Sequence, residues 1–196
     1  MTAAGDEQRR LRADAALNRD KLLEVAARHF AAEGSNASMK AIASEAGVGI
    51  GTLYRRFPCR EMLVEATYRS ESQRLCGAAY DLLHQMSPLD ALRAWMNQFL
   101  EYMAAKRGMA DSLKVVLRAD EHLRLKTREM LTDSLMMLLR AGQVAGVIRP
   151  EVEPADVVVA LGGFAMITGE EELPDLRRRL LDIILFGLAS LPQVSR

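Results

Sequence analysis

The chain has 196 residues, and its 26 Lys and Arg residues are balanced by 26 Asp and Glu residues. Because 49% of the residues are hydrophobic, the chain can bury a sizeable core, which excludes wholesale disorder. The two cysteines cannot form a disulfide framework, and no apolar run approaches the roughly 20 residues that span a bilayer. We therefore expect a cytoplasmic protein with no membrane partner.

The N-terminal segment, residues 1–18, is polar and alanine-rich and contains several arginines, so we expect a flexible basic arm there. The first helix is predicted from Arg19 to Glu33, where apolar residues recur at helical spacing. Gly34 follows this stretch and is a typical helix stop. The arm is therefore expected to lead directly into a helix with one apolar face.

Two short helices joined by a tight turn are predicted next. Ser38 is a suitable cap for the earlier helix, and Gly47 can adopt the positive φ that the turn needs. The later helix is predicted from Gly49 to Arg56 and stops before Pro58. Three helices with a tight turn between the last two form the helix-turn-helix pattern, in which the last helix enters the major groove of DNA.

Helical spacing continues through the remainder of the chain, with no sustained strand-like alternation. A long amphipathic helix is predicted from about Arg60 to Met86, and Ser87-Pro88 begins another one. Further helices are predicted at about residues 110–118, 121–145, 154–168 and 173–190. The sequence therefore predicts an all-α protein, with a helix-turn-helix domain at residues 19–66 and a helical domain at residues 67–196.

The predicted helix-turn-helix resembles a known family. Residues 41–48 (AIASEAGV) and 51–58 (GTLYRRFP) are similar to the DNA-binding domain of tetracycline-repressor-like (TetR family) regulators. The close match covers about residues 19–68, whereas the C-terminal part resembles the family only in its all-helical layout. The resemblance implies a homodimeric repressor that a small molecule releases from a palindromic DNA operator.

Hydroxyl and guanidinium groups on the third helix are suitable donors to phosphates and base edges. The resemblance places Thr52 and Tyr54 on phosphates or base edges. It places Ser38, Lys40 and Arg60 on the DNA backbone. The full set of expected DNA contacts is Ser38, Lys40, Gly49, Ile50, Thr52, Tyr54, Arg55, Arg56 and Arg60.

Charge separates the two halves of the chain. Residues 1–60 carry 10 basic and 7 acidic residues, and the remaining residues carry an equal and opposite excess, so the net charge of zero is an average. A basic head is compatible with DNA, although Arg55, Arg56 and the arginines of the arm could instead form solvated surface. Histidines and cysteines are scattered without metal-ligand or catalytic spacing, so no enzyme, metal or cofactor is expected.

The C-terminal helices suggest a dimer interface. Residues 157–167 are apolar on all faces, so a helix there is predicted to be almost wholly buried. Two such helices from each of two subunits would form a four-helix interface, as the resemblance also implies, and the alternative is an intrachain core. The expected interface residues are Val158, Leu161, Gly162, Ala165, Leu180, Ile184 and Leu188.

Aromatic residues and methionines between residues 95 and 137 are typical of an adaptable apolar cavity. The expected residues around a largely apolar effector are Trp95, Met96, Phe99, Tyr102, Met103, Leu113, Met136 and Met137, and each could instead be plain core. Two other functions stay open at this point. One is a regulator without a pocket that is constitutive or controlled by a protein partner. The other is a helical enzyme or carrier with a vestigial DNA-binding head.

Overall fold

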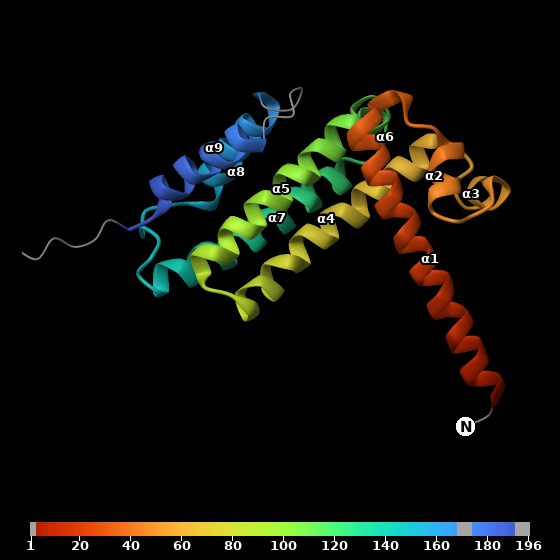
Figure 1. Cartoon of the computed structure of the whole chain (residues 1–196), viewed down its shortest axis with the longest axis horizontal. Coiled ribbons are helices and arrows are strands. Elements are labelled where there is room, and N and C mark those ends of the chain that lie inside the picture. Colours follow the sequence, from red (N-terminus) through yellow and green to blue (C-terminus); the bar gives the residue numbers. More distant parts are fainter. Residues whose placement is uncertain (1–2, 168–173, 191–196) are drawn as a thin grey trace, which may run out of the picture. The chain divides into compact units, whose positions relative to one another are not determined.

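The computed structural model describes residues 3–167 and 174–190, with the side chains of residues 18–166 and 175–190. Within these ranges the chain forms α-helices and one short 3-10 helix, η1 (Figure 1). The single β pairing among the described residues is an isolated antiparallel bridge between Ile148 and Ala189. The predicted all-α class is confirmed.

The helices follow one another with short connections. In chain order they are α1 (Ala3–Glu33), η1 (Gly34–Asn36), α2 (Met39–Glu45), α3 (Ile50–Arg56), α4 (Arg60–Gln85), α5 (Pro88–Gly108), α6 (Ala110–Ala119), α7 (Glu121–Val144), α8 (Pro154–Ile167) and α9 (Pro174–Leu188). From α4 onward these limits agree closely with the predicted ones. None of the helices in the described part of the chain is both long enough and apolar enough to cross a bilayer.

The first helix begins at Ala3, so the predicted start at Arg19 is wrong. The segment before Arg19 is rich in Ala and Arg, which have high helix propensities, and it contains no proline. Asn18 is a residue type that often caps a helix, but the helix continues through it. The basic segment at this end of the chain is therefore helical.

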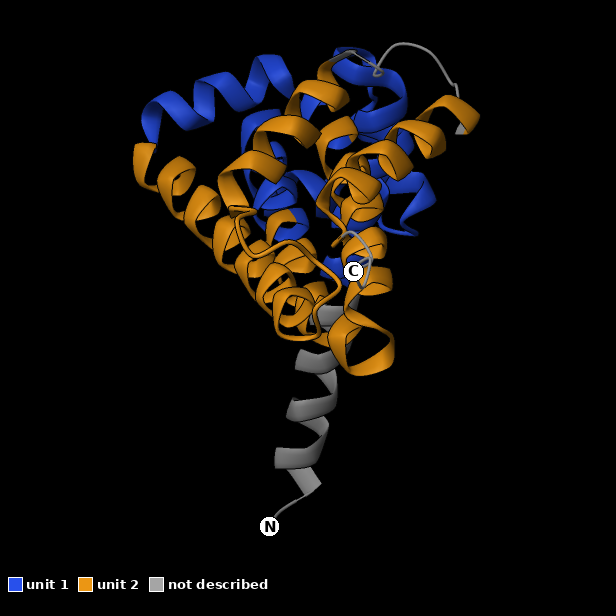
Figure 2. Cartoon of the chain, turned by 90° about the vertical axis from the view of Figure 1, so that its left-hand side faces the viewer, with its two compact units in different colours: residues 1–71, 105–120 blue, residues 72–104, 121–196 orange. Residues whose placement is uncertain are grey.

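The chain forms two compact units (Figure 2). Unit 1 comprises residues 1–71 and 105–120, and unit 2 comprises residues 72–104 and 121–196. The change from one unit to the other occurs within α4 and again within α5. The predicted domain division after residue 66 also falls within α4, but the sequence did not indicate that α6 belongs with unit 1.

Unit 1 is built around the apolar stripe of α1. Leu23, Ala26 and Phe30 are completely buried, and Ile42 of α2 and Leu53 of α3 are buried with them. Both α2 and η1 contact α1, and α3 contacts α2. This packing fixes the three N-terminal helices as one body, as a helix-turn-helix requires.

Unit 2 packs its helices through both apolar and polar contacts. The indole N–H of Trp95 in α5 donates to the carbonyl oxygen of Leu75 in α4 at 3.0 Å. Arg93 of α5 forms an ion pair with Asp182 of α9. The connection between α7 and α8 is held to the end of α9, because the Arg149 N–H donates to the Leu188 carbonyl at 3.0 Å.

Candidate functional site

The turn between α2 and α3 has the geometry that the sequence predicted. The hydroxyl of Ser38 accepts a hydrogen bond from the Ala41 N–H at 3.4 Å and caps α2. Gly47 has φ of 73°, a left-handed conformation that glycine adopts without the steric penalty of a Cβ atom. The Val48 N–H donates to the Ala43 carbonyl at 2.9 Å and closes the turn. These contacts set the angle at which α3 leaves α2.

A single side chain anchors the recognition helix α3. Leu53 is the only residue of α3 that is buried, with no exposed surface, and Phe57 directly after the helix is 6% exposed. Tyr54 is 47% exposed and Ile50 is 40% exposed. The helix therefore presents nearly all of its side chains outward.

Eight of the nine predicted DNA-contact residues are exposed. They are Ser38, Lys40, Gly49, Ile50, Thr52, Tyr54, Arg55 and Arg56. The Arg55 guanidinium donates to the Thr52 hydroxyl at 3.0 Å, one helical turn earlier, so two of these side chains form one polar group on the surface of α3. Their exposure is what DNA contact requires, and the contacts themselves stay a prediction.

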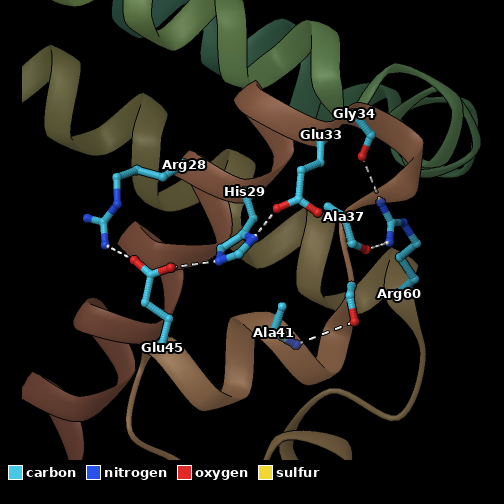
Figure 3. A network of polar contacts seen from close by, with 9 residues as sticks. Arg28, His29, Glu33, Gly34, Ala37, Ala41, Glu45 and Arg60 are labelled. Atoms are coloured by element: carbon cyan, nitrogen blue, oxygen red, sulfur yellow. Dashed lines mark hydrogen bonds and ion pairs between the residues drawn. The ribbon is translucent and has the colours of Figure 1, made fainter.

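Arg60 is predicted to contact the DNA backbone, but its guanidinium binds protein atoms in the structure. Its guanidinium donates to the carbonyl oxygens of Ala37 at 2.6 Å and Gly34 at 3.1 Å (Figure 3). It also stacks over the ring of Phe30, at 5.0 Å from the ring centroid. Both carbonyls lie in the connection that follows α1. Arg60 therefore joins the end of α1 to the start of α4, and we assign it a positioning role.

Two family models match the chain. Residues 22–67 match the model for bacterial regulatory proteins of the tetR family, and residues 87–190 match the model for the C-terminal domain of SbtR-like transcriptional regulators. The chain belongs to the TetR family. The two matches together cover the helix-turn-helix and most of the C-terminal helices, so the resemblance is no longer limited to the N-terminal head.

Solved structures agree with this assignment. A TetR transcriptional regulator from Streptomyces coelicolor is 42% identical, with a TM-score of 0.82 over 89% of this chain and 99% of that one. A TetR regulatory protein from Mycobacterium vanbaalenii is 34% identical, with a TM-score of 0.73 over 92% and 99% of the two chains. The comparison with curated proteins gives no match. The protein is a DNA-binding transcriptional regulator and not an enzyme.

A polar network that the sequence analysis missed joins α1 to α2 in this TetR-family head (Figure 3). The Glu45 carboxylate lies 2.7 Å from the Arg28 guanidinium and 2.8 Å from Nε2 of His29. Nδ1 of His29 lies 2.6 Å from the Glu33 carboxylate. Hydrogen bonds from Arg28 and His29 lower the pKa of Glu45. The spacing of four between His29 and Glu33 was the only local signal for this network.

The predicted effector residues do not all lie together. Trp95, Met96, Phe99 and Tyr102 are buried on α5, and their aromatic rings form a row with centroid separations of 5.6 Å and then 6.1 Å. Met103 and Met136 are half-buried.

Two predicted effector residues differ from this row. Met137 is 44% exposed and lies on the outer face of α7, between the buried Leu135 and Leu138, so its pocket role stays a prediction. Leu113 is buried, but it belongs to unit 1, whereas the aromatic row belongs to unit 2. The row on α5 is therefore the part of the predicted set that the structure brings together.

The predicted dimer-interface residues also differ from one another in exposure. Leu161, Ala165 and Leu188 are buried within the single chain. The other four, Val158, Gly162, Leu180 and Ile184, are half-buried.

The apolar side chains that face outward are different ones. On α8 they are Val159, 74% exposed, and Met166, 78% exposed, and on α9 they are Ile183, 64% exposed, and Phe186, 73% exposed. The prediction that α8 is almost wholly buried is therefore wrong for the single chain. In each helix the exposed residues recur at helical spacing and form a stripe.

Proposed function

We propose that this TetR-family regulator binds a palindromic operator as a homodimer and represses transcription until a largely apolar small molecule releases it. The observation that carries the DNA half of the proposal is the outward face of α3, where a helix anchored by Leu53 alone presents Thr52, Tyr54 and two arginines. A helix of this kind reads base edges through its side chains and is positioned by phosphate contacts. With DNA as its partner, the protein acts in the cytoplasm.

The exposed apolar stripes on α8 and α9 support the homodimer. Val159 and Met166 are seven residues apart, as two turns of a helix require, and Gly163 between them is also exposed. Contiguous apolar surface of this kind is typical of an interface in a protein that does not enter a membrane. A second copy meeting these stripes across a two-fold axis would bury them and would present two recognition helices to one duplex.

The DNA-reading role can be tested without knowing the operator. Duplexes that bind the full-length protein are selected from a random pool, and the best duplex is used in a mobility-shift titration. Tyr54→Ala is expected to weaken binding about tenfold or more, because it removes an exposed contact from the recognition helix. Tyr80→Ala is the matched control, because Tyr80 is 58% exposed on α4 but lies outside the head.

The two variants separate the possible outcomes. The proposal requires a selected sequence with two-fold symmetry, a weaker complex for Tyr54→Ala and an unchanged complex for Tyr80→Ala. Equal binding by the wild type and both variants would mean that α3 does not read DNA.

The aromatic row on α5 supports the effector half of the proposal. Trp95, Phe99 and Tyr102 give a rigid apolar wall, and Met96 gives an adaptable one. Two buried polar atoms in unit 2 have no protein partner: the side-chain oxygen of Gln98 and the Nε atom of Arg177. An unused acceptor and an unused donor suit an effector that is largely apolar with few polar groups.

Trp95 reports on the effector because it is the only tryptophan of the chain and is completely buried. An effector bound against the aromatic row is expected to change its fluorescence and to weaken the complex with the selected duplex about fivefold or more, the typical size of an allosteric coupling. The two effects are measured in one titration series with apolar compounds. Equal duplex affinity with and without every compound that alters Trp95 emission would contradict release by an effector.

The same aromatic row is densely buried, which favours the alternative of a regulator without an effector pocket. Trp95, Met96 and Phe99 are each at most 3% exposed, as in an ordinary solid core. A regulator with such a core would bind DNA constitutively or respond to a protein partner. No compound would then alter Trp95 emission, while the Tyr54→Ala result would stay the same.

A further inference from the structure

His29 occupies a bridging position in the head of this regulator. It lies on α1, and its two ring nitrogens face carboxylates on different helices: Glu33 on α1 at 2.6 Å and Glu45 on α2 at 2.8 Å (Figure 3). The His29 side chain is 14% exposed, whereas the Glu33 and Glu45 side chains are 42% and 49% exposed. Glu45 is the last residue of α2, and the turn to the recognition helix begins directly after it.

The two carboxylates beside the His29 ring favour one of its protonation states. A neutral imidazole has one N–H group and one lone pair, so it can donate to only one of two carboxylates and turns its lone pair toward the other. An imidazolium ion donates to both. Partial burial opposes the charged form, but hydrogen bonds and charge attraction from Glu33 and Glu45 outweigh it and raise the pKa of His29 above its ordinary value of 6.5.

Charged residues lie on both helices that His29 joins. On α1 Glu33 contacts the ring, and Arg28 pairs with Glu24. On α2 Glu45 contacts the ring, and Lys40 is exposed. The connecting helix η1 has no titratable residue. Arg28 shares the Glu45 carboxylate with His29, so Glu45 keeps one cation when His29 loses its proton.

We propose that His29 is a positioning residue whose protonated form holds the end of α2 against α1, so that the head binds DNA more tightly with His29 charged than with His29 neutral. Loss of the proton leaves the ring one N–H group for two carboxylates and removes its charge, so the contact with Glu45 is weakened or lost and the Arg28 contact becomes the stronger of the two. That contact lies on a more exposed side chain and constrains the end of α2 less. The turn at Gly47 and the start of α3 follow immediately, and the recognition helix therefore loses part of its fixed orientation.

The direction of the effect follows from linkage. A group whose pKa is raised in the folded head contributes stability fully below its ordinary pKa of 6.5, and this contribution disappears as the pH rises through the raised value. Affinity for DNA is therefore expected to fall as the solution passes from mildly acidic to mildly alkaline. Hydrogen bonds from Arg28 and His29 lower the pKa of Glu45, so the Glu45 carboxylate stays ionised throughout this range.

The test measures the affinity of the full-length protein for one duplex that it has selected, at about pH 6 and about pH 8.5 and at constant ionic strength. Histidine changes its charge within this range. The wild type is expected to bind about threefold more weakly per head at the higher pH, which is the effect of losing one partly exposed charged contact. His29→Gln is expected to bind with nearly the same affinity at both values. His84→Gln is the matched control, because His84 lies on α4 outside the head and contacts the Tyr80 carbonyl.

If His29→Gln does not fold, a measurement on a second variant tests the same proposal. In Glu45→Gln, the NMR titration midpoint of His29 is expected to fall toward its ordinary value, and the pH dependence of duplex affinity is expected to shrink in parallel. A wild-type affinity that does not change with pH, or a change that persists in the folded His29 and Glu45 variants, would overturn the proposal. Failure of the wild type to bind any duplex would instead count against the DNA-reading role of α3.

Discussion

A Phe186→Glu variant is expected to be monomeric and to bind the selected duplex about a hundredfold more weakly than the wild type. Phe186 is 73% exposed on the outer stripe of α9, so a carboxylate there is tolerated in the single chain but would be buried without a partner in the proposed interface. A monomer keeps one recognition helix per duplex and loses the gain from binding two half-sites together. Sedimentation velocity and a mobility-shift titration measure the two effects.

Val144→Glu is the matched control for this experiment. Val144 is 91% exposed at the end of α7, in the same unit, but it lies on neither stripe. The control is expected to keep the mass and the duplex affinity of the wild type. A dimeric Phe186→Glu variant with full affinity would mean that the second subunit does not cover α9.

The largest expected loss of stability comes from Gly108→Ala. A Cβ atom at Gly108, the last residue of α5, would lie 1.6 Å from the carbonyl oxygen and 2.4 Å from the carbonyl carbon of Phe30 in α1. Both atoms belong to the backbone, so α1 itself would have to move. We expect the free energy of unfolding to fall by about 3 kcal/mol or more, the upper range for overpacking a core.

Gly77→Ala is the control for the glycine prediction. Gly77 is exposed within α4, and a Cβ atom there would meet nothing within 4 Å. Alanine favours a helix over glycine by about 1 kcal/mol, so this variant is expected to be slightly more stable than the wild type. Urea unfolding of the three proteins measures the differences, and equal midpoints for Gly108→Ala and the wild type would show that α5 does not approach α1 so closely.

Local sequence signals were sufficient for most of the fold. Ser38 as a cap and Gly47 as the turn residue act through their own backbone, so their roles could be read from neighbouring residues. Leu53 is the single buried residue of α3. The outward face of α3 was then predictable, because the remaining side chains have no other direction.

The parts that were missed depend on residues distant in the sequence. Arg60 contacts the end of α1 more than twenty positions earlier, and Glu45 reaches His29 on a different helix. No local pattern relates such positions. On α8 every face is apolar, so hydrophobic periodicity could not distinguish the buried Leu161 from the exposed Val159.

The structure of the head shows which of its basic residues are available to DNA phosphates. The guanidinium groups of Arg28 and Arg60 contact neighbouring protein atoms, so these two arginines are less available for phosphates. Arg55, Arg56 and Lys40 are exposed and stay available for phosphates. We therefore expect few phosphate contacts per head and a moderate dependence of duplex affinity on salt.

The most direct test of the central claim is the mass of the complex with DNA. The selected palindromic duplex and a duplex carrying one half-site are each titrated with the wild type, and the stoichiometry is measured by sedimentation. We predict two protomers on the palindrome, with half-sites about one helical turn apart, and much weaker binding to the half-site. One protomer per duplex, bound equally well to both DNAs, would contradict the account.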